Sequence, residues 1–476
     1  MIRKKGNRTN KFRFCAGEGQ DVMGKTEKNS VHHLRIEGYA SGGEGVARLA
    51  DGQVVFIRGA LQGELCDVQL LKMGKSAAWG KVNAVLEPSA RRMEPDCPYF
   101  PKCGGCQLRH MTYEEELEFK RGRVEDALQR IGGVEAEVAV IHGAPSPARY
   151  RNKAQFPVSP GPESPLVGFY RARSHDVIDV EDCLLQHPAA AGLRRGLKAW
   201  MAECGISAYE ETEHKGLIRH FFVRVNGAGQ SLCALVINGR SVPRGTRLVE
   251  LLRQAEPGLV GVVLSVNREK TNVILGTRFL TLWGRDYLED TLCGLTFRLS
   301  VPSFYQVNRT QAEVLYGRAL DFAGLTGRET VLDLYCGAGT ITLVMAGKAG
   351  RAIGAEVVPE AVEDARENAR RNGIANAEFL CADAGQAALE LAARGIRPDV
   401  VCVDPPRKGL SPEVIEAIAQ MTPARVVYVS CDPGTLARDV RLLRERGYTL
   451  QRVEAADLFP RTKHVECVVL MSRVKD

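Results

Sequence analysis

The sequence predicts an α/β protein whose C-terminal part is a doubly wound, Rossmann-like domain. From residue 330 to residue 431, apolar strand-like runs alternate with segments of helical apolar spacing, which is typical of a parallel sheet covered by helices. From Val31 to about Glu87, short alternating segments are broken by glycines, which indicates a small β-barrel. We therefore expect an N-terminal barrel, a mixed α+β centre and a C-terminal doubly wound domain.

The length of 476 residues leaves room for about three domains. We expect a basic arm at 1–29, the barrel at 30–88, a central domain at 89–285 and the doubly wound domain at 286–476. Hydrophobic residues make up 45% of the chain, yet no apolar stretch reaches the length of a bilayer. The basic N-terminus lacks the apolar core of a secretory signal. We therefore expect a cytoplasmic protein whose 14 cysteines are mostly reduced.

The positive charge is concentrated at the N-terminus. The net charge of +7 favours a polyanionic partner. Few apolar residues occur in 1–29, so this segment is predicted to be a disordered arm. Its basic residues are Arg3, Lys4, Lys5, Arg8, Lys11 and Arg13. Translation starting at Met23 is the alternative, in which case most of the arm is absent from the protein.

The glycine-broken region from Val31 to about Glu87 contains five strand-like segments. Five short strands in so few residues are typical of an OB-like barrel, a fold that commonly binds single-stranded nucleic acid. A purely structural barrel is the alternative, because fold alone does not define function.

A cluster of cysteines follows the barrel, in the segment C-P-Y-F-P-K-C-G-G-C. Cys97, Cys103 and Cys106 have a spacing at which thiolates converge on zinc or on an iron–sulfur cluster, and either needs a fourth ligand. Cys183 is the candidate, and His187 is a weaker alternative for zinc. The spacing leaves the choice between zinc and iron–sulfur open.

The central region combines a predicted helix over 113–132 with loops and strands rich in basic residues. These residues are candidates for phosphate contacts and have no expected catalytic role. They are Arg149, Arg151, Lys153, Arg171, Arg173 and His175.

The C-terminal part contains a nucleotide cradle, T-V-L-D-L-Y-C-G-A-G-T-I-T-L. Gly337 and Gly339 permit close backbone approach at the start of a helix, as in Rossmann-type turns. Glu356 ends the next strand, where an acidic residue typically binds ribose hydroxyls. Asp383 and Asp404 follow the two strands after that. The carboxyl ends of parallel strands share one edge, so we expect an adenosyl ligand there.

The last strand of this series, V-V-Y-V-S-C-D-P-G-T, delivers Cys431 to the same edge. A helical segment follows, so we expect Cys431 to face the positive end of a helix, which favours the nucleophilic thiolate. A buried structural cysteine is the alternative for this segment taken alone.

Five motifs together resemble the RNA uracil-5-methyltransferase family: S-F-Y-Q-V-N, D-L-Y-C-G-A-G-T, D-P-P-R-K-G, S-C-D-P-G-T and H-V-E-C-V-V-L. The resemblance covers most of the chain, because the barrel resembles a TRAM domain. The four cysteines resemble the 4Fe-4S site of the 23S rRNA branch, whereas the tRNA branch is expected to lack both features. The cluster has no step in methyl transfer, so it is expected to be structural or RNA-positioning, with redox sensing as an alternative.

The resemblance implies roles for individual residues. Gln306, Tyr335, Glu356 and Asp404 would contact S-adenosylmethionine, together with the cradle residues Gly337, Gly339 and Asp383. Cys431 would be the nucleophile and Glu466 the base. Thr340 departs from the family pattern, because some relatives carry asparagine beside the cofactor.

The residue types suit this chemistry. Carbon 5 of uracil is a poor nucleophile, and addition of a thiolate at carbon 6 makes it reactive toward an electrophilic methyl group. A positioned base must then remove the carbon 5 proton. We therefore expect a uracil-5-methyltransferase acting on a flipped-out base in 23S rRNA, with tRNA as the second candidate substrate and no obligate protein partner.

Three other classes are alternatives. A cytosine-5 RNA methyltransferase typically has a Pro-Cys and a Thr-Cys motif, whereas this chain has Ser430-Cys431. An N-methyltransferase leaves Cys431 and Glu466 without a role. A non-catalytic iron–sulfur RNA-binding protein is the third alternative.

Overall fold

The computed structural model describes residues 27–474, so the expectations for the basic arm and for Met23 lie outside the described residues. The chain forms two compact units. The first contains the residues up to Pro98 together with 106–119 and 461–463, and the second contains the rest. Helix α1 (Tyr113–Arg130) begins where the sequence predicts a helix. The finer division into four parts stays a prediction.

The first unit contains a six-stranded sheet with strand order β1-β5-β6-β4-β3-β2. The strands are β1 (Val31–Arg35), β2 (Gly38–Tyr39), β3 (Gly45–Arg48), β4 (Val54–Arg58), β5 (Leu65–Met73) and β6 (Ala77–Glu87). The sequence predicts five strands here, because β2 is too short to give a periodic signal of its own. Every second side chain along the strands points into a buried core, which includes Val55, Val68 and Ala78.

The second unit contains a seven-stranded sheet with order β10-β9-β8-β11-β12-β13-β14. Its strands are β8 (Lys153–Ser159), β9 (Leu166–Tyr170), β10 (Val177–Asp179), β11 (Ile218–Val225), β12 (Ser231–Ile237), β13 (Leu259–Val266) and β14 (Arg278–Gly284). Helices α2 (Pro188–Cys204) and α3 (Gly245–Ala255) cover one face through a core centred on Trp200, which is fully buried.

An eight-stranded sheet carries the predicted cradle, with order β19-β18-β17-β20-β21-β23-β22-β7. The strands are β7 (Val140–His142), β17 (Thr330–Leu334), β18 (Arg351–Glu356), β19 (Ala377–Cys381), β20 (Val400–Val403), β21 (Arg425–Ser430), β22 (Tyr448–Ala456) and β23 (Glu466–Arg473). Strands β17 to β21 pair in parallel, and β23 pairs antiparallel to β21. The doubly wound sheet predicted from the sequence is confirmed.

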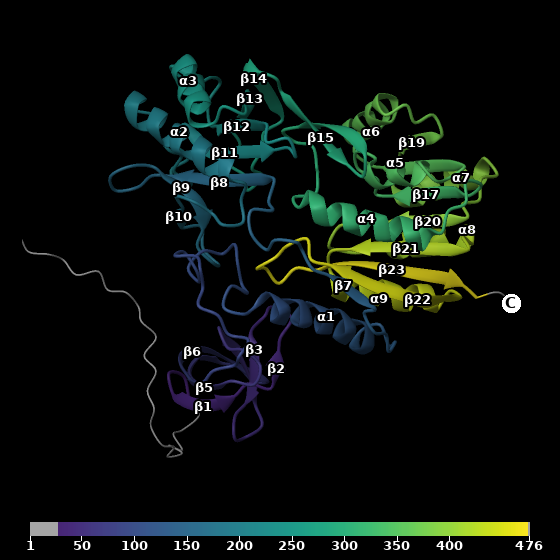
Figure 1. Ribbon diagram of the computed structural model, residues 1–476, viewed down its shortest axis with the longest axis horizontal. Helices are drawn as coiled ribbons and strands as arrows, with labels where there is room; N and C mark the ends of the chain where they lie inside the picture. The colour runs from purple at the N-terminus through teal and green to yellow at the C-terminus, as the bar shows by residue number, and fades with distance from the viewer. Residues whose placement is uncertain (1–26, 475–476) are drawn as a thin grey trace, which may run out of the picture. The chain divides into compact units, whose positions relative to one another are not determined.

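Helices cover both faces of this sheet (Figure 1). On one face lie α4 (Arg309–Ala323), α5 (Thr340–Ala346) and α6 (Pro359–Arg371). On the other lie α7 (Ala384–Ala393), α8 (Pro412–Met421) and α9 (Pro433–Arg444). Within the described residues, no helix has both the length and the apolar character needed to cross a membrane.

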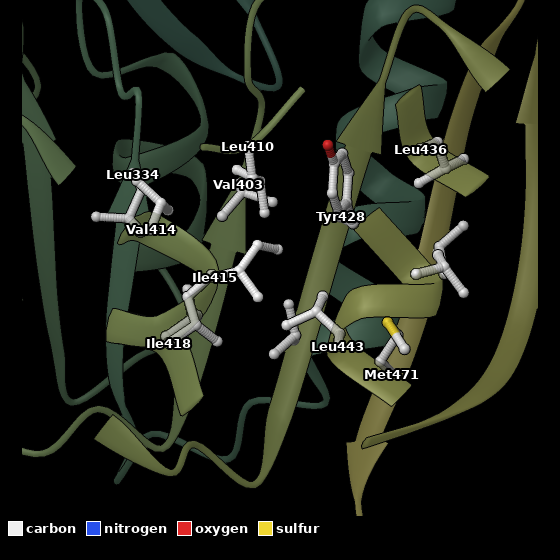
Figure 2. Packing of buried hydrophobic residues seen from close by; sticks show 14 of the residues in the cluster. Leu334, Val403, Leu410, Val414, Ile415, Ile418, Tyr428, Leu436, Leu443 and Met471 are labelled. Atoms are coloured by element: carbon white, nitrogen blue, oxygen red, sulfur yellow. The ribbon is translucent and has the colours of Figure 1, made fainter. Parts of the chain in front are cut away.

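The core beneath α8 and α9 fixes β21, the strand that ends directly before Cys431. Figure 2 shows Leu436 and Leu443 of α9 packed with Ile415 of α8, Tyr428 of β21 and Met471 of β23. All five are buried, so α9 is held against the strands on which the neighbouring turn depends.

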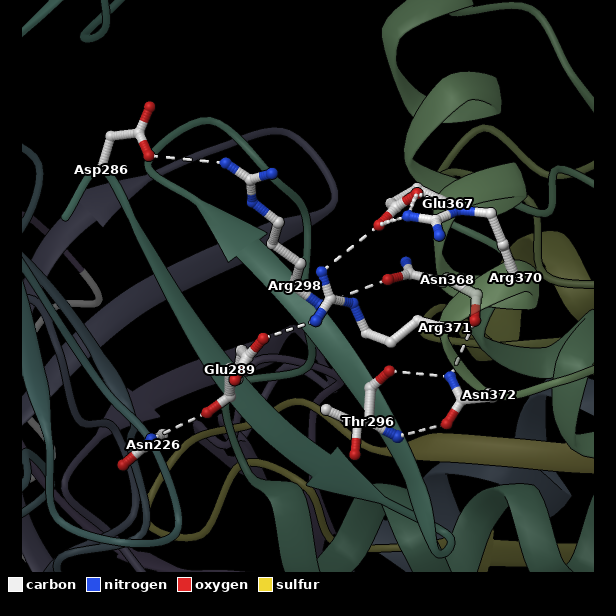
Figure 3. A network of polar contacts seen from close by, with 10 residues as sticks. All are labelled: Asn226, Asp286, Glu289, Thr296, Arg298, Glu367, Asn368, Arg370, Arg371 and Asn372. Atoms are coloured by element: carbon white, nitrogen blue, oxygen red, sulfur yellow. Dashed lines mark hydrogen bonds and ion pairs between the residues drawn. The ribbon is translucent and has the colours of Figure 1, made fainter.

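A hairpin of β15 (Tyr287–Leu292) and β16 (Leu295–Ser300) leads into the S-F-Y-Q-V-N loop. Polar contacts fasten this hairpin to the end of α6 (Figure 3). Arg371 forms an ion pair with Glu289, and the Thr296 backbone N–H donates to the Asn372 side chain over 2.8 Å. The loop that follows β16 therefore starts from a fixed position beside the large sheet.

Candidate active site

The predicted site residues of the C-terminal domain gather at one edge of the eight-stranded sheet. Tyr335, Glu356, Asp404 and Cys431 stand at or just beyond the carboxyl ends of β17, β18, β20 and β21. From β17 the chain adds β18 and β19 on one side of the sheet and then returns to add β20 and β21 on the other side. The adjacent strands β17 and β20 therefore flank the point where the strand order reverses. A switch point of this kind is where open α/β sheets bind ligands.

The loop after β17 has the open backbone that a cofactor cradle needs. Gly337 and Gly339 have φ values of +54° and +80°, and a side chain built at Gly337 would meet no atom within 4 Å. Tyr335 also has positive φ, at +68°. This conformation is costly for a tyrosine and is held by a 3.0 Å hydrogen bond from its N–H to the Ala355 carbonyl.

Three carboxylates meet beside this loop. Glu356 accepts a 3.1 Å hydrogen bond from the Gly337 N–H, and Asp333 accepts one of 2.6 Å from the Thr342 hydroxyl. Burial, together with the charges of Asp404 and Glu356, raises the pKa of Asp333 to about 7. Burial also raises the pKa of Asp404 to about 7. Such a cluster favours a positively charged ligand.

Gln306 reaches the same edge from the S-F-Y-Q-V-N loop. Its backbone carbonyl accepts a 2.9 Å hydrogen bond from Asn152, and its side chain bonds the Tyr316 hydroxyl. That hydroxyl lies 3.5 Å from the Thr340 hydroxyl, and burial together with the charge of Asp404 raises the pKa of Tyr316. Gln306, Thr340 and Asp404 therefore surround one tyrosine.

Strand pairing brings Cys431 close to Glu466. In the antiparallel pair of β21 and β23, Ser430 lies opposite Cys467, so Cys431, which follows Ser430, comes beside Glu466, which precedes Cys467. The two side chains are close enough for the charge of Glu466 to raise the pKa of the Cys431 thiol. Glu466 is 4% exposed and Cys431 is half-buried. The sequence motifs that carry these residues lie more than thirty positions apart.

The expected thiolate of Cys431 is wrong for this structure. Burial, followed by the charges of Glu466 and Asp404, raises the pKa of the Cys431 thiol to about 11. The helix does not offset this, because the Asp432 carboxylate caps α9 by accepting from the N–H groups of Gly434 and Thr435. The helix end that was expected to stabilise the thiolate carries a carboxylate.

Burial and the nearby charge of Asp404 raise the pKa of Glu466 to about 8. The exposed Arg407 opposes the shifts of both Cys431 and Glu466. Sequence reasoning missed Arg407, although it belongs to the D-P-P-R-K-G motif. The available signal was its place in the sequence, because Arg407 closely follows the end of β20, the edge at which the other site residues lie.

Asp439 is a second residue that the sequence did not indicate. This fully buried carboxylate on α9 accepts from the Tyr428 hydroxyl over 2.7 Å and from the Leu410 N–H over 2.8 Å. It ties the loop that carries Arg407 to the helix after Cys431.

Asp383 has a local partner in this structure. Its carboxylate accepts hydrogen bonds from the N–H groups of Gly385 and Gln386, as a capping residue of α7 does. Its expected contact with the cofactor stays a prediction.

The predicted phosphate-binding residues differ in their surroundings. Arg149 forms an ion pair with Asp182 over 2.6 Å, and His175 lies 3.1 Å from Glu211. Lys153 is instead desolvated, and burial together with two nearby arginines lowers its pKa to about 8.

The cysteine cluster is divided between the two units, with Cys97 and Cys106 in the first and Cys103 and Cys183 in the second. Within the described part of the chain, no group of three or more His, Cys, Asp or Glu side chains is arranged to hold a metal ion. The segment around Cys103 bonds the end of β9, because the Gly104 N–H donates to the Tyr170 carbonyl over 3.0 Å.

The same segment also lies near Cys183. The Tyr99 hydroxyl accepts a 3.0 Å hydrogen bond from the Glu181 N–H, only two residues before Cys183. The Gly105 N–H donates to the Cys103 sulfur over 3.5 Å. Backbone donors of this kind accompany thiolate ligands in iron–sulfur proteins.

Known proteins resemble this chain over nearly its whole length. A sequence profile of tRNA (uracil-5-)-methyltransferases matches residues 270–474, and one of the TRAM domain matches residues 25–82. An uncharacterized RNA methyltransferase of Clostridium tetani is 43% identical over 451 residues, covering 94% of this chain and 98% of the relative. One from Listeria monocytogenes serovar 1/2a is 42% identical over 447 residues, covering 94% and 98%.

A solved structure matches as well. It is the Pyrococcus abyssi tRNA (uracil-54, C5)-methyltransferase in complex with S-adenosyl-L-homocysteine, with a TM-score of 0.74, 26% identity, and coverage of 92% of this chain and 99% of that one. The unmatched part of this chain is shorter than the region 30–88, so the match includes at least part of that region. The expectation that tRNA enzymes lack the N-terminal barrel stays a prediction.

The fold, the cradle and these matches define an S-adenosylmethionine-dependent methyltransferase that acts on RNA. More particularly, the chain belongs to the RNA (uracil-5-)-methyltransferase family and carries a TRAM domain.

Proposed function

We propose that the chain methylates carbon 5 of a uracil in RNA through a covalent adduct with Cys431. The observation that carries this proposal is the pairing of Ser430 with Cys467, which brings the following residue, Cys431, close to the buried Glu466 at the cradle edge. A nucleophile and a base in adjacent positions suit a reaction with one addition and one proton removal.

S-adenosylmethionine supplies an electrophilic methyl group on its positively charged sulfur. The residues at the cradle edge fit this group, because Gly337 leaves open space and Asp333, Glu356 and Asp404 favour a cation. We propose that Gln306, Tyr335, Glu356 and Asp404 bind it, with Gly337, Gly339 and Asp383 contributing to the cradle.

The chemistry of the protein's own residues follows in order. Cys431 loses its proton to water and its sulfur bonds to carbon 6 of the uracil. Carbon 5, activated in this way, would take the methyl group that bound S-adenosylmethionine would supply. Glu466 removes the carbon 5 proton, and the electrons of that bond expel the Cys431 sulfur. A carboxylate with a pKa of about 8 is a stronger base than an ordinary glutamate.

We propose 23S rRNA as the substrate, supported by the spacing of Cys97, Cys103 and Cys106, which resembles the cluster site of the 23S rRNA branch. Transfer RNA is the second candidate, favoured by the match to the Pyrococcus abyssi tRNA enzyme. Both substrates imply action in the cytoplasm.

We propose that Cys97, Cys103, Cys106 and Cys183 hold a 4Fe-4S cluster. Support comes from the four thiols, from the N–H donor at Cys103, and from a 3.4 Å contact of the Arg109 guanidinium with the Cys106 sulfur. The test is iron and sulfide content after anaerobic purification, compared between the native chain and Cys103→Ser. Equal, iron-free preparations would contradict the proposal.

The function is tested with radiolabelled S-adenosylmethionine and separate pools of unmodified 23S rRNA and tRNA. We expect label in 5-methyluridine from 23S rRNA, and no label with Cys431→Ala. Label only from tRNA selects the second substrate. Label in 5-methylcytidine or in an N-methylated base contradicts the mechanism.

A further inference from the structure

The loop after β20 places Arg407 on a closed turn. The Gly409 N–H donates to the Pro406 carbonyl over 2.8 Å, so Arg407 is the second residue of a four-residue turn. The Arg407 side chain is exposed, whereas Gly409 and the following Leu410 are buried. The exposed guanidinium is therefore attached to a backbone whose far end is anchored in the protein.

Two adjacent residues of α9 hold this turn. Arg438 donates to the carbonyls of Lys408 and Leu410 over 2.9 and 3.1 Å. Asp439 accepts from the Leu410 N–H over 2.8 Å. The Arg438 side chain also donates to Asp439 over 2.8 Å, so the two holding residues orient each other. The backbone on both sides of Gly409 is thus bonded to side chains of α9.

Asp439 itself is fixed in one position. It is fully buried and also accepts from the Tyr428 hydroxyl over 2.7 Å. Gly409 has a φ of +72°, and a Cβ added to it would lie 2.5 Å from the Asp439 carboxylate. Burial of a carboxylate is costly unless hydrogen bonds compensate it, so Asp439 depends on its donors as much as they depend on it. The turn and the carboxylate therefore hold each other in place.

The charge of Arg407 acts on the reacting groups. Burial raises the pKa values of the Cys431 thiol and of Glu466, and the charge of Arg407 opposes both shifts. The carboxylates that raise the pKa of the thiol are Glu466, Asp404 and Asp432. A Coulomb interaction weakens as the distance grows, so the opposing effect of Arg407 depends on where its guanidinium is held.

We propose that Asp439 is a positioning residue that holds the turn and so keeps the Arg407 guanidinium where its positive charge favours the Cys431 thiolate. Asp439 touches no reacting atom. When it is lost, Arg407 spreads over more conformations, and its average charge at the sulfur falls. This inference rests on the proposed function, because it concerns the nucleophile of that reaction.

The test compares the rates at which iodoacetate and iodoacetamide alkylate Cys431 in the full-length chain without cofactor. Mass spectrometry identifies the modified peptide. Both reagents attack the same thiolate, but only iodoacetate is negative, so the ratio of the two rates reports the charge beside the sulfur. We expect Arg407→Ala to lower this ratio about 3- to 10-fold, as loss of a nearby unit charge does. Asp439→Asn should lower it almost as much.

The double variant distinguishes positioning from an independent effect. If Asp439 acts through Arg407, then Asp439→Asn combined with Arg407→Ala lowers the ratio no further than Arg407→Ala alone. Arg438→Gln removes the bonds to two carbonyls of the turn and should also lower the ratio. Its side chain is partly exposed, so this variant tests the inference even where Asp439→Asn does not fold.

Tyr428→Phe is the matched control. It removes one hydrogen bond to Asp439 but leaves both residues that hold the turn, so it should lower the free energy of unfolding and keep the native ratio. Circular dichroism checks that each variant is folded. A ratio that falls equally in Tyr428→Phe would show that general loosening, and not the position of Arg407, is being measured.

A native ratio in folded Asp439→Asn and Arg438→Gln chains, or additive losses in the double variant, would overturn the inference. The proposed function fails separately, because alkylation needs no RNA. If the native chain makes no 5-methyluridine while Asp439→Asn still lowers the ratio, only the proposed function is refuted. If Cys431→Ala loses methylation while Asp439→Asn keeps the native ratio, only the role of Asp439 is refuted.

Discussion

Replacing Glu466 with glutamine should stabilise the protein at high pH while it stops turnover. The native fold holds the Glu466 proton more tightly than the unfolded chain does, because burial raises the pKa from 4.5 to about 8. Its contribution to stability is therefore complete below about pH 4.5 and is lost as pH rises toward 8. Each pKa unit corresponds to about 1.4 kcal/mol, which gives an upper value of about 5 kcal/mol.

Glutamine has nearly the same shape and does not titrate. Glu466→Gln should therefore match the native chain near pH 5 and exceed its free energy of unfolding by several kcal/mol at pH 9. Urea unfolding at both pH values measures this difference. A variant that is no more stable at pH 9 than at pH 5, relative to the native chain, would refute the assignment of Glu466 as a desolvated carboxyl.

The same substitution should trap the reaction. Cys431 and the methyl transfer step are intact in Glu466→Gln, but no carboxylate is available to remove the carbon 5 proton. We expect a covalent, methylated RNA–protein complex that resists denaturing electrophoresis. Turnover at the native rate would refute the role of Glu466 as the base, and the double variant with Cys431→Ala should form no complex.

Three further predictions concern the cradle, the core and the nucleophile. Gly339→Ala should weaken cofactor binding measured by calorimetry, because the new Cβ would lie 3.0 Å from a ring carbon of Phe379. Gly373→Ala is the control: Gly373 also has positive φ but has open space around it, so this variant should bind the cofactor with native affinity. Tyr428→Phe should cost about 2 kcal/mol in urea unfolding, because its hydroxyl bonds a buried carboxylate, whereas Tyr448→Phe loses only a carbonyl partner and should cost about 1 kcal/mol. Iodoacetamide should alkylate Cys431 faster with a positively charged cofactor analogue bound than with S-adenosylhomocysteine; equal rates would contradict the electrostatic reasoning.

The sequence predicts the main sheet well, because each parallel strand is an apolar run with its own boundaries. The carboxyl ends of those runs correctly locate Tyr335, Glu356, Asp404 and Cys431 at one edge. Short elements escape this reasoning. The strand Val140–His142 joins the far edge of the sheet through pairing with β22, and its three residues have no periodic signal.

Electrostatic properties of the site were harder to predict than its location. The expected thiolate of Cys431 rested on the helix that follows it in the sequence. The pKa of the thiol is raised first by burial, which exists only in the folded chain, and then by the charges of Glu466 and Asp404, which come from other parts of the sheet. The capping of α9 by Asp432 was visible in the sequence as D-P-G-T, and it was the local signal against the thiolate.

The raised pKa values have a common physical origin that bears on the order of events. Four partly or fully buried groups lie at one edge of the sheet: Asp333, Asp404, Glu466 and Cys431. The charge of Asp404 opposes the ionisation of the other three, and the charge of Glu466 also opposes that of Cys431. A positively charged methyl donor at this edge lowers the cost of every one of these charges. The thiolate should therefore form most readily once the donor is bound, and transfer of the methyl group removes that positive charge. Once the positive charge of the donor is gone, the buried carboxylates bind a proton more readily. This favours the step in which Glu466 accepts the carbon 5 proton.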